Sequence, residues 1–244
     1  MTQSVATAEA VLRSGLDALA FPEASRISEQ LMRFGGLLLE ANERTNLVGS
    51  VDIDKLVVQH FLDSLAPFST HRFRPPIVDL GSGAGLPGIP VAIAFPRAPV
   101  TLVEPRRLRA EFLHFVVTTM GLANVEVVQT AAESAGRSPA RREKSGTVLI
   151  RAIGKPAVAL ELGLPLLKHD GKLWLYRGRD AEPTEEVLDV ARFLGGSLVS
   201  ADRIEVPHLE AERHLWVFRK VTSSPEGYPR RSGVPGRTPI QAGK

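Results

Sequence analysis

Beyond residue 76 the sequence alternates between short apolar runs and stretches whose apolar residues recur at helical spacing, and few folds accommodate that order. The apolar runs predict strands at residues 77–80, 100–103, 125–128, 147–151 and 172–176. The intervening helical stretches cover residues 88–95, 106–121, 131–144 and 156–167. Because strands that alternate with helices form βαβ units with right-handed crossovers, this order predicts an α/β fold with a mostly parallel sheet.

The N-terminal part of the chain lacks this alternation. Its apolar residues recur at helical spacing in three stretches, at residues 5–19, 27–39 and 53–68. The pair Pro75-Pro76 then breaks the helical pattern. Residues 1–74 are therefore predicted to form a helical N-terminal extension.

The C-terminal part also departs from the alternation. After a helical stretch at residues 182–194, two apolar segments at residues 196–206 and 213–221 follow each other without a helix between them. Consecutive strands of this kind predict an antiparallel end to the sheet. The α/β domain would then span residues 75–221 and leave residues 222–244 as a tail.

The tail carries the whole charge excess of the chain. The net charge is +3, from 30 basic and 27 acidic side chains. Residues 222–244 contain four basic residues and one acidic residue, in the order Glu226, Arg230, Arg231, Arg237 and Lys244. The segment is also rich in proline and glycine, so it cannot fold alone. We favour a basic arm for an anionic partner, and a strap packed on the globular part is the alternative.

The composition excludes several kinds of chemistry. The 244 residues include no cysteine, which rules out disulfides, thiolate metal sites and a cysteine nucleophile. The six histidines show no metal-binding spacing, so we expect no metal site. No apolar run approaches the roughly 18 residues of a membrane span, and the first residues lack the pattern of a signal peptide. We expect a cytoplasmic protein without membrane contact, with a monomer favoured.

A glycine-rich loop lies between the first predicted strand of the sheet and the helix that follows it. Residues 79–88 read Asp-Leu-Gly-Ser-Gly-Ala-Gly-Leu-Pro-Gly, and glycines allow tight turns and close approach of a ligand. Glu104 ends the next predicted strand, so both segments meet at the carboxyl edge of the sheet, where ligands bind. A carboxylate there can accept hydrogen bonds from both hydroxyls of a ribose. The pair predicts a nucleoside site.

Two ligand classes compete for this loop, and a purely structural turn is the third possibility. Gly83, Gly85 and Gly88 match the G-x-G-x-x-G fingerprint of dinucleotide sites, which would make the protein an NAD-dependent oxidoreductase. That fingerprint should start at the strand end, however, and the predicted strand ends at Leu80. The alternative frame Asp79-x-Gly81-x-Gly83-x-Gly85 is typical of class I methyltransferases that use S-adenosylmethionine, and we favour it.

The remaining residues narrow the methyltransferase chemistry. Without cysteine, thiol addition to a pyrimidine ring is not available. The strand at 147–151 is followed by Ala152-Ile153-Gly154, which differs from the Asn/Asp-Pro-Pro-aromatic loop of exocyclic amine methylation. What remains is a methyl transfer that needs neither a nucleophilic residue nor a metal.

Several stretches resemble one family closely. They are Asn46-Leu47, His60-Phe61-Leu62-Asp63-Ser64, the loop 79–90 with its Gly-Leu-Pro-Gly-Ile-Pro end, Arg151-Ala152, Arg213-His214-Leu215 and residues 228–235. Over residues 30–240 the chain resembles the RsmG (GidB) family of 16S rRNA guanine-N7 methyltransferases. The resemblance implies a class I, Rossmann-like fold, S-adenosylmethionine as cofactor, and N7 of guanine 527 in the 530 loop of 16S rRNA, or of the small ribosomal subunit, as the target.

The resemblance also assigns roles to residues. It places cofactor contacts at Gly81 and Leu86, at Ala132-Glu133 beside the adenine, and at Arg151, in addition to Gly83, Gly85 and Glu104. No catalytic residue is expected, because guanine N7 already carries a lone pair and catalysis can rest on positioning.

Basic and helical residues supply the candidates for contact with RNA. His60 and Asp63 lie three apart on one predicted helix face, and Arg177 stands where many members have lysine. The other candidates are Arg106, Arg107, Arg230 and Arg231. A non-catalytic RNA-binding protein that keeps a cofactor site remains an alternative.

Overall fold

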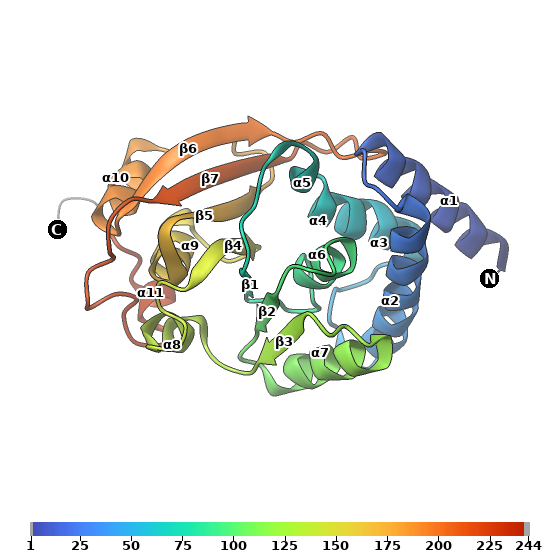
Figure 1. The fold of residues 1–244 in the computed structure, drawn as a ribbon, viewed down its shortest axis with the longest axis horizontal. Coiled ribbons are helices and arrows are strands. Elements are labelled where there is room, and N and C mark those ends of the chain that lie inside the picture. Colours follow the sequence, from blue (N-terminus) through green and yellow to red (C-terminus); the bar gives the residue numbers. More distant parts are fainter. Residues whose placement is uncertain (1, 242–244) are drawn as a thin grey trace.

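The computed structural model describes residues 2–241, with side chains from Val5 onward. This part of the chain forms a seven-stranded sheet in the order β3-β2-β1-β4-β5-β7-β6 (Figure 1). The strands are β1 (Ile77–Leu80), β2 (Val100–Val103), β3 (Val125–Val128), β4 (Ser145–Arg151), β5 (Leu167–Arg177), β6 (Gly196–Arg203) and β7 (His214–Lys220). Strands β1 to β5 pair in parallel, whereas β7 runs antiparallel to both β5 and β6. The predicted α/β fold with a mostly parallel sheet and an antiparallel end is confirmed.

The register of the central strands brings their carboxyl ends to one edge. Leu80 of β1 pairs with Val103 of β2, and Arg151 of β4 pairs with Tyr176 of β5. All four residues of β1 are buried, as expected for a central parallel strand covered by helices on both faces. Residues that follow these strands therefore meet at a single edge, on which a ligand site can be built.

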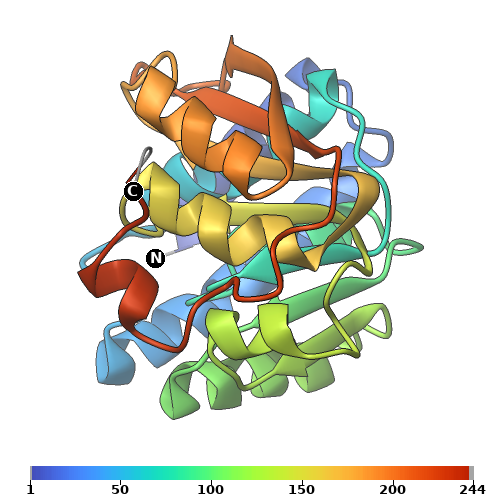
Figure 2. The ribbon, with the colours of Figure 1, turned by 90° about the vertical axis from the view of Figure 1, so that its left-hand side faces the viewer.

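Helices cover both faces of the sheet (Figures 1 and 2). On one face, α6 (Gly88–Ala94) and α7 (Arg107–Met120) pack with the N-terminal helices. On the other face lie α8 (Ala132–Arg137), α9 (Pro156–Gly163) with the 3₁₀ turn η2 (Leu164–Leu166), and α10 (Glu185–Phe193). The helix predicted for residues 131–144 is too long, because α8 ends before Pro139, and a residue that precedes proline disfavours the helical region.

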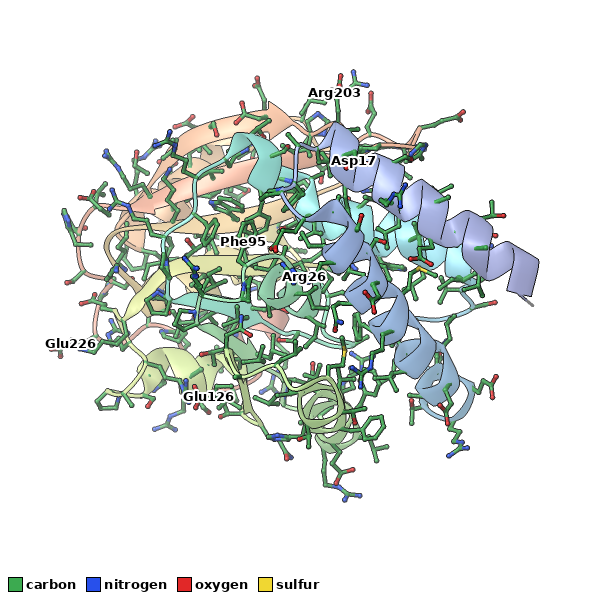
Figure 3. The ribbon with its side chains drawn as sticks, turned by 45° about the vertical axis from the view of Figure 1, so that its right-hand side comes forward. Asp17, Arg26, Phe95, Glu126, Arg203 and Glu226 are labelled. Atoms are coloured by element: carbon green, nitrogen blue, oxygen red, sulfur yellow. The ribbon has the colours of Figure 1, made fainter. Side chains whose placement is uncertain are left out.

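The N-terminal helices share a core with the sheet. They are α1 (Thr2–Ala18), α2 (Ala24–Thr45), α3 (Ile53–Leu56), the π-helical turn η1 (Val57–Leu62), α4 (Asp63–Leu65) and α5 (Pro67–Thr70). Leu31 and Phe34 of α2 belong to the same buried cluster as Leu102 of β2. Arg26 of α2 donates a hydrogen bond to the carbonyl of Ile93 in α6 at 3.2 Å, and Figure 3 shows it reaching toward that helix. The helical N-terminal region is present as predicted, and it is packed onto the sheet; its boundary at residue 74 stays a prediction.

Residues 222–241 lie on the globular part and contain one short helix, α11 (Val234–Arg237). We call them the C-terminal strap. In Figure 2 the strap descends from β7 and crosses below α9 to α11 on the opposite side. Lys244, which the sequence adds to the basic tail, lies outside the described residues.

Candidate active site

The glycine loop after β1 is fixed at both ends by buried hydrogen bonds. Asp79 is buried, and its Oδ2 accepts a hydrogen bond of 3.0 Å from the backbone N–H of Gly88, the first residue of α6. A Cβ at Gly88 would lie 2.3 Å from Cδ2 of Leu102, so this glycine permits the close packing of α6 on β2. Burial raises the pKa of Asp79 to about 7. Asp79 thus holds the loop rather than facing the carboxyl edge as a free carboxylate.

Glu104 faces the glycine loop from the end of β2. Its side chain is buried, and its two carboxylate oxygens accept hydrogen bonds of 2.9 Å from the backbone N–H groups of Gly83 and Arg106. Each oxygen keeps further acceptor capacity, as the two hydroxyls of a ribose require. A Cβ at Gly83 would lie 3.6 Å from Nη1 of Arg109, an ordinary van der Waals contact with the tip of a flexible side chain. The structure therefore brings together the two segments that the sequence predicts as a nucleoside site, and the carboxylate of Glu104 keeps acceptor capacity for a ligand.

The other predicted cofactor residues take different positions. Gly81 and Gly85 adopt left-handed backbone conformations, with φ of 77° and 90°. The side chain of Leu86 is buried in the core, and its N–H donates to the carbonyl of Ser82 at 3.1 Å. Ala132 and Glu133 begin α8, where Glu133 Oε1 accepts a hydrogen bond of 2.8 Å from the backbone N–H of Gly233 in the strap.

A second, cationic part of the site lies at the carboxyl ends of β4 and β5. A cavity of about 490 Å³ opens there, and its polar lining includes His60, Asp63, Arg151, Tyr176, Arg177 and Arg213. It adjoins the glycine loop, because a Cβ at Gly81 would lie 2.9 Å from Cδ1 of Ile153 in the segment after β4. The predicted cofactor residues and this cavity therefore form two halves of one edge of the sheet.

Asp63 joins three distant parts of the chain in this cavity. Its Oδ2 accepts a hydrogen bond of 3.2 Å from Nη1 of Arg151, and its Oδ1 accepts one of 2.9 Å from Nε of Arg213. Asp63 is buried, and burial raises its pKa while the two arginines oppose the shift. Two cations thus share one carboxylate, which leaves guanidinium N–H groups available on the cavity side.

His60 is held in one tautomer by Arg151. Nη2 of Arg151 lies 2.9 Å from Nδ1 of His60, and because arginine only donates, Nδ1 must be the acceptor and Nε2 must carry the proton. Burial, and after it the charges of Arg151 and Arg213, lower the pKa of His60 to about 4. At neutral pH His60 is therefore an uncharged donor. Its Nε2 has no hydrogen-bond partner among residues 2–241.

The π-helical turn η1 carries His60, and Asp63 follows it directly at the start of α4. Helices that locally carry one extra residue per turn reorient their side chains and often occur at functional sites. The sequence prediction of one continuous helix over residues 53–68 missed this turn. Ser64 follows it and donates its hydroxyl to the carbonyl of His60 at 2.5 Å, and the hydroxyl of Tyr176 donates to the carbonyl of Ser64 at 3.0 Å.

Arg213 and Tyr176 are residues of the cavity that the sequence analysis did not select. Arg213 precedes β7, and an antiparallel strand starts at the edge where its parallel neighbours end. The one signal in the sequence that could have pointed to Arg213 was the Arg213-His214-Leu215 stretch, which is part of the family resemblance. Arg177, which the sequence did select, lies over the ring of Trp216 at 4.9 Å and pairs with Asp180.

The predicted RNA contacts outside the cavity are dispersed. Arg106 and Arg107 are exposed where α7 begins, close to Glu104. Arg231 is exposed on the strap. Arg230 has an internal partner instead, because its guanidinium is paired with the fully buried Glu161, so a phosphate contact would require breaking that pair.

Two further features bear on function. Within residues 2–241, no three histidine, aspartate or glutamate side chains are grouped so that they could hold a metal ion. None of the described helices is both long and apolar enough to cross a membrane.

Comparison with known proteins identifies the family of this chain. Residues 27–215 match the family model GidB, described as rRNA small subunit methyltransferase G. Ribosomal RNA small subunit methyltransferase G of Geobacillus kaustophilus is 35% identical over 220 residues, which cover 89% of this chain and 92% of the relative. The protein of the same name from Roseiflexus castenholzii is 38% identical over 215 residues, 87% of this chain and 91% of the relative.

Among solved structures, a Pyrococcus horikoshii protein provisionally named a transferase superposes with a TM-score of 0.53 at 13% identity, over 66% of this chain and 63% of that one. That likeness concerns the fold alone. The extent and identity of the sequence matches settle the family: the chain belongs to the GidB family, rRNA small subunit methyltransferase G.

Proposed function

We propose that this enzyme transfers a methyl group from S-adenosylmethionine to N7 of guanine 527 in the 530 loop of 16S rRNA. The observation that carries the proposal is the cationic cavity beside the glycine loop, in which His60 is a neutral donor and Asp63 is shared by two arginines. Family membership supports the reaction class and the RNA substrate.

The cofactor half of the site supplies binding and orientation. Glu104 would accept the hydroxyls of the ribose, Ala132 and Glu133 would flank the adenine, and the loop from Gly81 to Leu86 would approach the amino-acid part. When bound, S-adenosylmethionine provides an electrophilic methyl group on a positively charged sulfur.

The base half of the site matches the Hoogsteen edge of guanine. This edge presents two acceptors, N7 and O6, whereas adenine presents a donor at N6. The Nε2–H of His60 can donate to O6, and it cannot become an acceptor while Arg151 occupies Nδ1. The cavity therefore favours guanine over adenine.

Neither His60 nor the arginines need to take up a proton. Guanine N7 has a free lone pair at neutral pH, and methylation places the positive charge on the ring. A histidine with a pKa of about 4 is a poor base near neutrality, as is a guanidinium, so the cavity suits a reaction driven by positioning and exclusion of water.

The surrounding arginines would hold the RNA backbone. Arg177, Arg179 and Arg213 line the cavity, and Arg106 and Arg107 lie beside the cofactor half. N7 lies in the deep groove of an A-form helix, so the substrate must be a splayed or loop nucleotide whose phosphates such cations can bind. We extend the proposal to a monomeric, cytoplasmic enzyme that needs no metal.

Methyl transfer to ribosomal subunits that lack the modification tests the proposal. With tritiated S-adenosylmethionine and 30S particles, we expect one labelled methyl group per particle, mapped to N7 of guanine 527. Binding of S-adenosylmethionine without transfer to any rRNA base would instead indicate a non-catalytic RNA-binding protein. Calorimetry with NAD serves as the control for the dinucleotide interpretation, and tight NAD binding would refute the assignment of the loop.

A further inference from the structure

We infer that the C-terminal strap positions Glu133 in the cofactor site, and that it belongs to this site rather than forming a free basic arm. The inference rests on the proposed function, because it takes Glu133 as a residue beside the adenine. It concerns which residues hold that side chain in place. Two anchors fix the strap, and beyond them it reaches Glu133.

The first anchor is where the strap leaves β7. Lys220 is buried, and its Nζ donates to the carbonyl of Leu164 at 2.9 Å and to the hydroxyl of Ser224. Arg142 donates to the carbonyls of Ser224 at 2.8 Å and of Tyr228 at 2.6 Å. A single guanidinium thus fixes two points of the strap, four residues apart.

The second anchor is the pair formed by Arg230 and Glu161 of α9. Glu161 is fully buried, and its carboxylate accepts hydrogen bonds from the backbone N–H of Arg230 at 2.9 Å, from Nε at 2.8 Å and from Nη2 at 2.6 Å. The guanidinium of Arg230 is therefore committed to a partner within the protein. A bidentate pair with an added backbone bond gives the strap a fixed position and orientation.

Between and beyond the anchors the strap contacts both ends of the short helix α8. At one end, a Cβ at Gly136 would lie 2.8 Å from Cγ of Pro229, so the absence of a side chain lets the buried proline approach. At the other end, the N–H of Gly233 donates to Oε1 of Glu133 at 2.8 Å. The strap therefore spans α8, and its Gly233 contacts the carboxylate of Glu133 before α11 begins.

The strap continues past the two anchors, although these alone would hold it on the globular part. The Arg230–Glu161 pair already secures the segment, yet the chain continues to Gly233, where a φ of 79° turns its N–H toward Glu133, and then into α11. A carboxylate held by a backbone donor keeps one orientation before the ligand arrives, which reduces the ordering cost of binding. The strap thus preorganises the adenine side of the site.

The test is a chain that ends after Ser232. It keeps both anchors but removes the N–H of Gly233 together with α11. We expect the dissociation constant for S-adenosylmethionine to rise about ten-fold, the effect of roughly 1.4 kcal/mol, and that for S-adenosylhomocysteine to rise equally because both carry the same adenosine. The KM for S-adenosylmethionine should rise similarly, with kcat at saturation unchanged. A chain that ends after Gln241 is the matched control and should bind normally.

A double-mutant cycle with Glu133→Ala tests whether the strap affects cofactor affinity through Glu133. If the strap acts through Glu133, shortening the chain in that background adds nothing to the loss of affinity. If shortening the Glu133→Ala variant lowers the affinity as much as it does in the wild type, the strap does not act through Glu133. If the shortened wild-type chain folds and its affinity is unchanged, the inference itself is wrong. A wild-type protein that fails to bind S-adenosylmethionine at all would instead refute the proposed function.

A second variant covers the case in which the shortened chain does not fold. Gly233→Ala deletes nothing, but it places a side chain at a left-handed φ and so loosens the end of the strap. We expect a smaller loss of affinity in the same direction, two- to five-fold, and no loss would count against the inference. If RNA binding loses salt dependence while cofactor binding is intact, the strap is an RNA arm and the inference is wrong.

Discussion

Asp63 and Glu161 are two buried carboxylates that bind arginines from distant parts of the sequence, yet their surroundings differ. Asp63 binds both Arg151 and Arg213, and it lies beside a cavity of about 490 Å³. Glu161 has one arginine, Arg230, whose backbone N–H and guanidinium supply all three of its hydrogen bonds, and it is fully buried. Under the proposed function, the same ion-pair chemistry serves recognition at Asp63 and anchoring at Glu161. The difference is whether the arginines keep donors that face open space.

The largest effect should come from breaking the anchor. Arg230→Ala leaves the Glu161 carboxylate buried without its cation, which costs about 3–5 kcal/mol of the free energy of unfolding. Urea unfolding followed by circular dichroism measures it. Arg231→Ala removes the same charge from an exposed neighbour and should change stability by less than about 0.5 kcal/mol.

A double replacement sharpens this prediction. Changing Glu161 and Arg230 together to methionine removes both charges from a buried position, and such swaps are often neutral. We expect most of the lost stability to return. If the double variant is as unstable as Arg230→Ala, the pair is not the source of the effect.

The Asp63 cluster should respond in activity more than in stability. In Asp63→Asn, Arg151 and Arg213 lose the charge that orients them, so we expect kcat/KM for 30S subunits to fall about a hundred-fold, the scale of a charge-assisted contact of roughly 3 kcal/mol. The affinity for S-adenosylmethionine, measured by calorimetry, should fall by much less, because Arg151 is the one predicted cofactor contact that Asp63 orients. A parallel loss of cofactor affinity would mean that the two halves of the site are not separable.

His60 allows a test of base recognition. With 2,6-diaminopurine at the target position, O6 becomes an amine, and a fixed donor should reject it. We expect the wild-type enzyme to prefer guanine about a hundred-fold and His60→Gln about ten-fold, because a glutamine amide can turn to accept, and one good contact is worth roughly 1–3 kcal/mol. Equal discrimination by both enzymes would exclude His60 from reading O6.

The smallest effect concerns pH. The pKa of His60 is lowered from 6.5 to about 4, so its contribution to stability is complete above pH 6.5 and is lost as the pH falls toward 4. His60→Gln should therefore flatten the decline of the unfolding free energy over this range. NMR titration should show an imidazole that stays neutral, with its proton on Nε2, down to about pH 5. A midpoint near 6.5 would contradict the tautomer that Arg151 imposes.

Local signals in the sequence predicted the sheet and the cofactor half of the site. Strands 77–80, 100–103 and 125–128 coincide with β1, β2 and β3, and the glycine loop meets Glu104 because both follow adjacent parallel strands. Periodicity and glycine spacing act over a few residues, which suffices for these features.

The cavity and the strap depend on contacts that no local pattern encodes. Asp63 and Arg213 are 150 residues apart, and Glu161 and Arg230 are 69 residues apart. From composition alone, the arginines of residues 222–244 were predicted to be free for an anionic partner. Composition gives the number of charges but not the residues with which they pair. One signal was available: Glu161 stands alone in the apolar stretch Ala-Leu-Glu-Leu-Gly, and a carboxylate buried there requires a cation from elsewhere.

The distance between Glu161 and Arg230 also has a consequence for biosynthesis. A ribosome that adds about 5–20 residues per second makes Glu161 several seconds before its partner. During that interval α9 carries a carboxylate that cannot be buried without penalty, so the C-terminal half of the sheet cannot reach its full stability. Co-translational folding of this face is therefore completed only when the last segment of the chain has emerged.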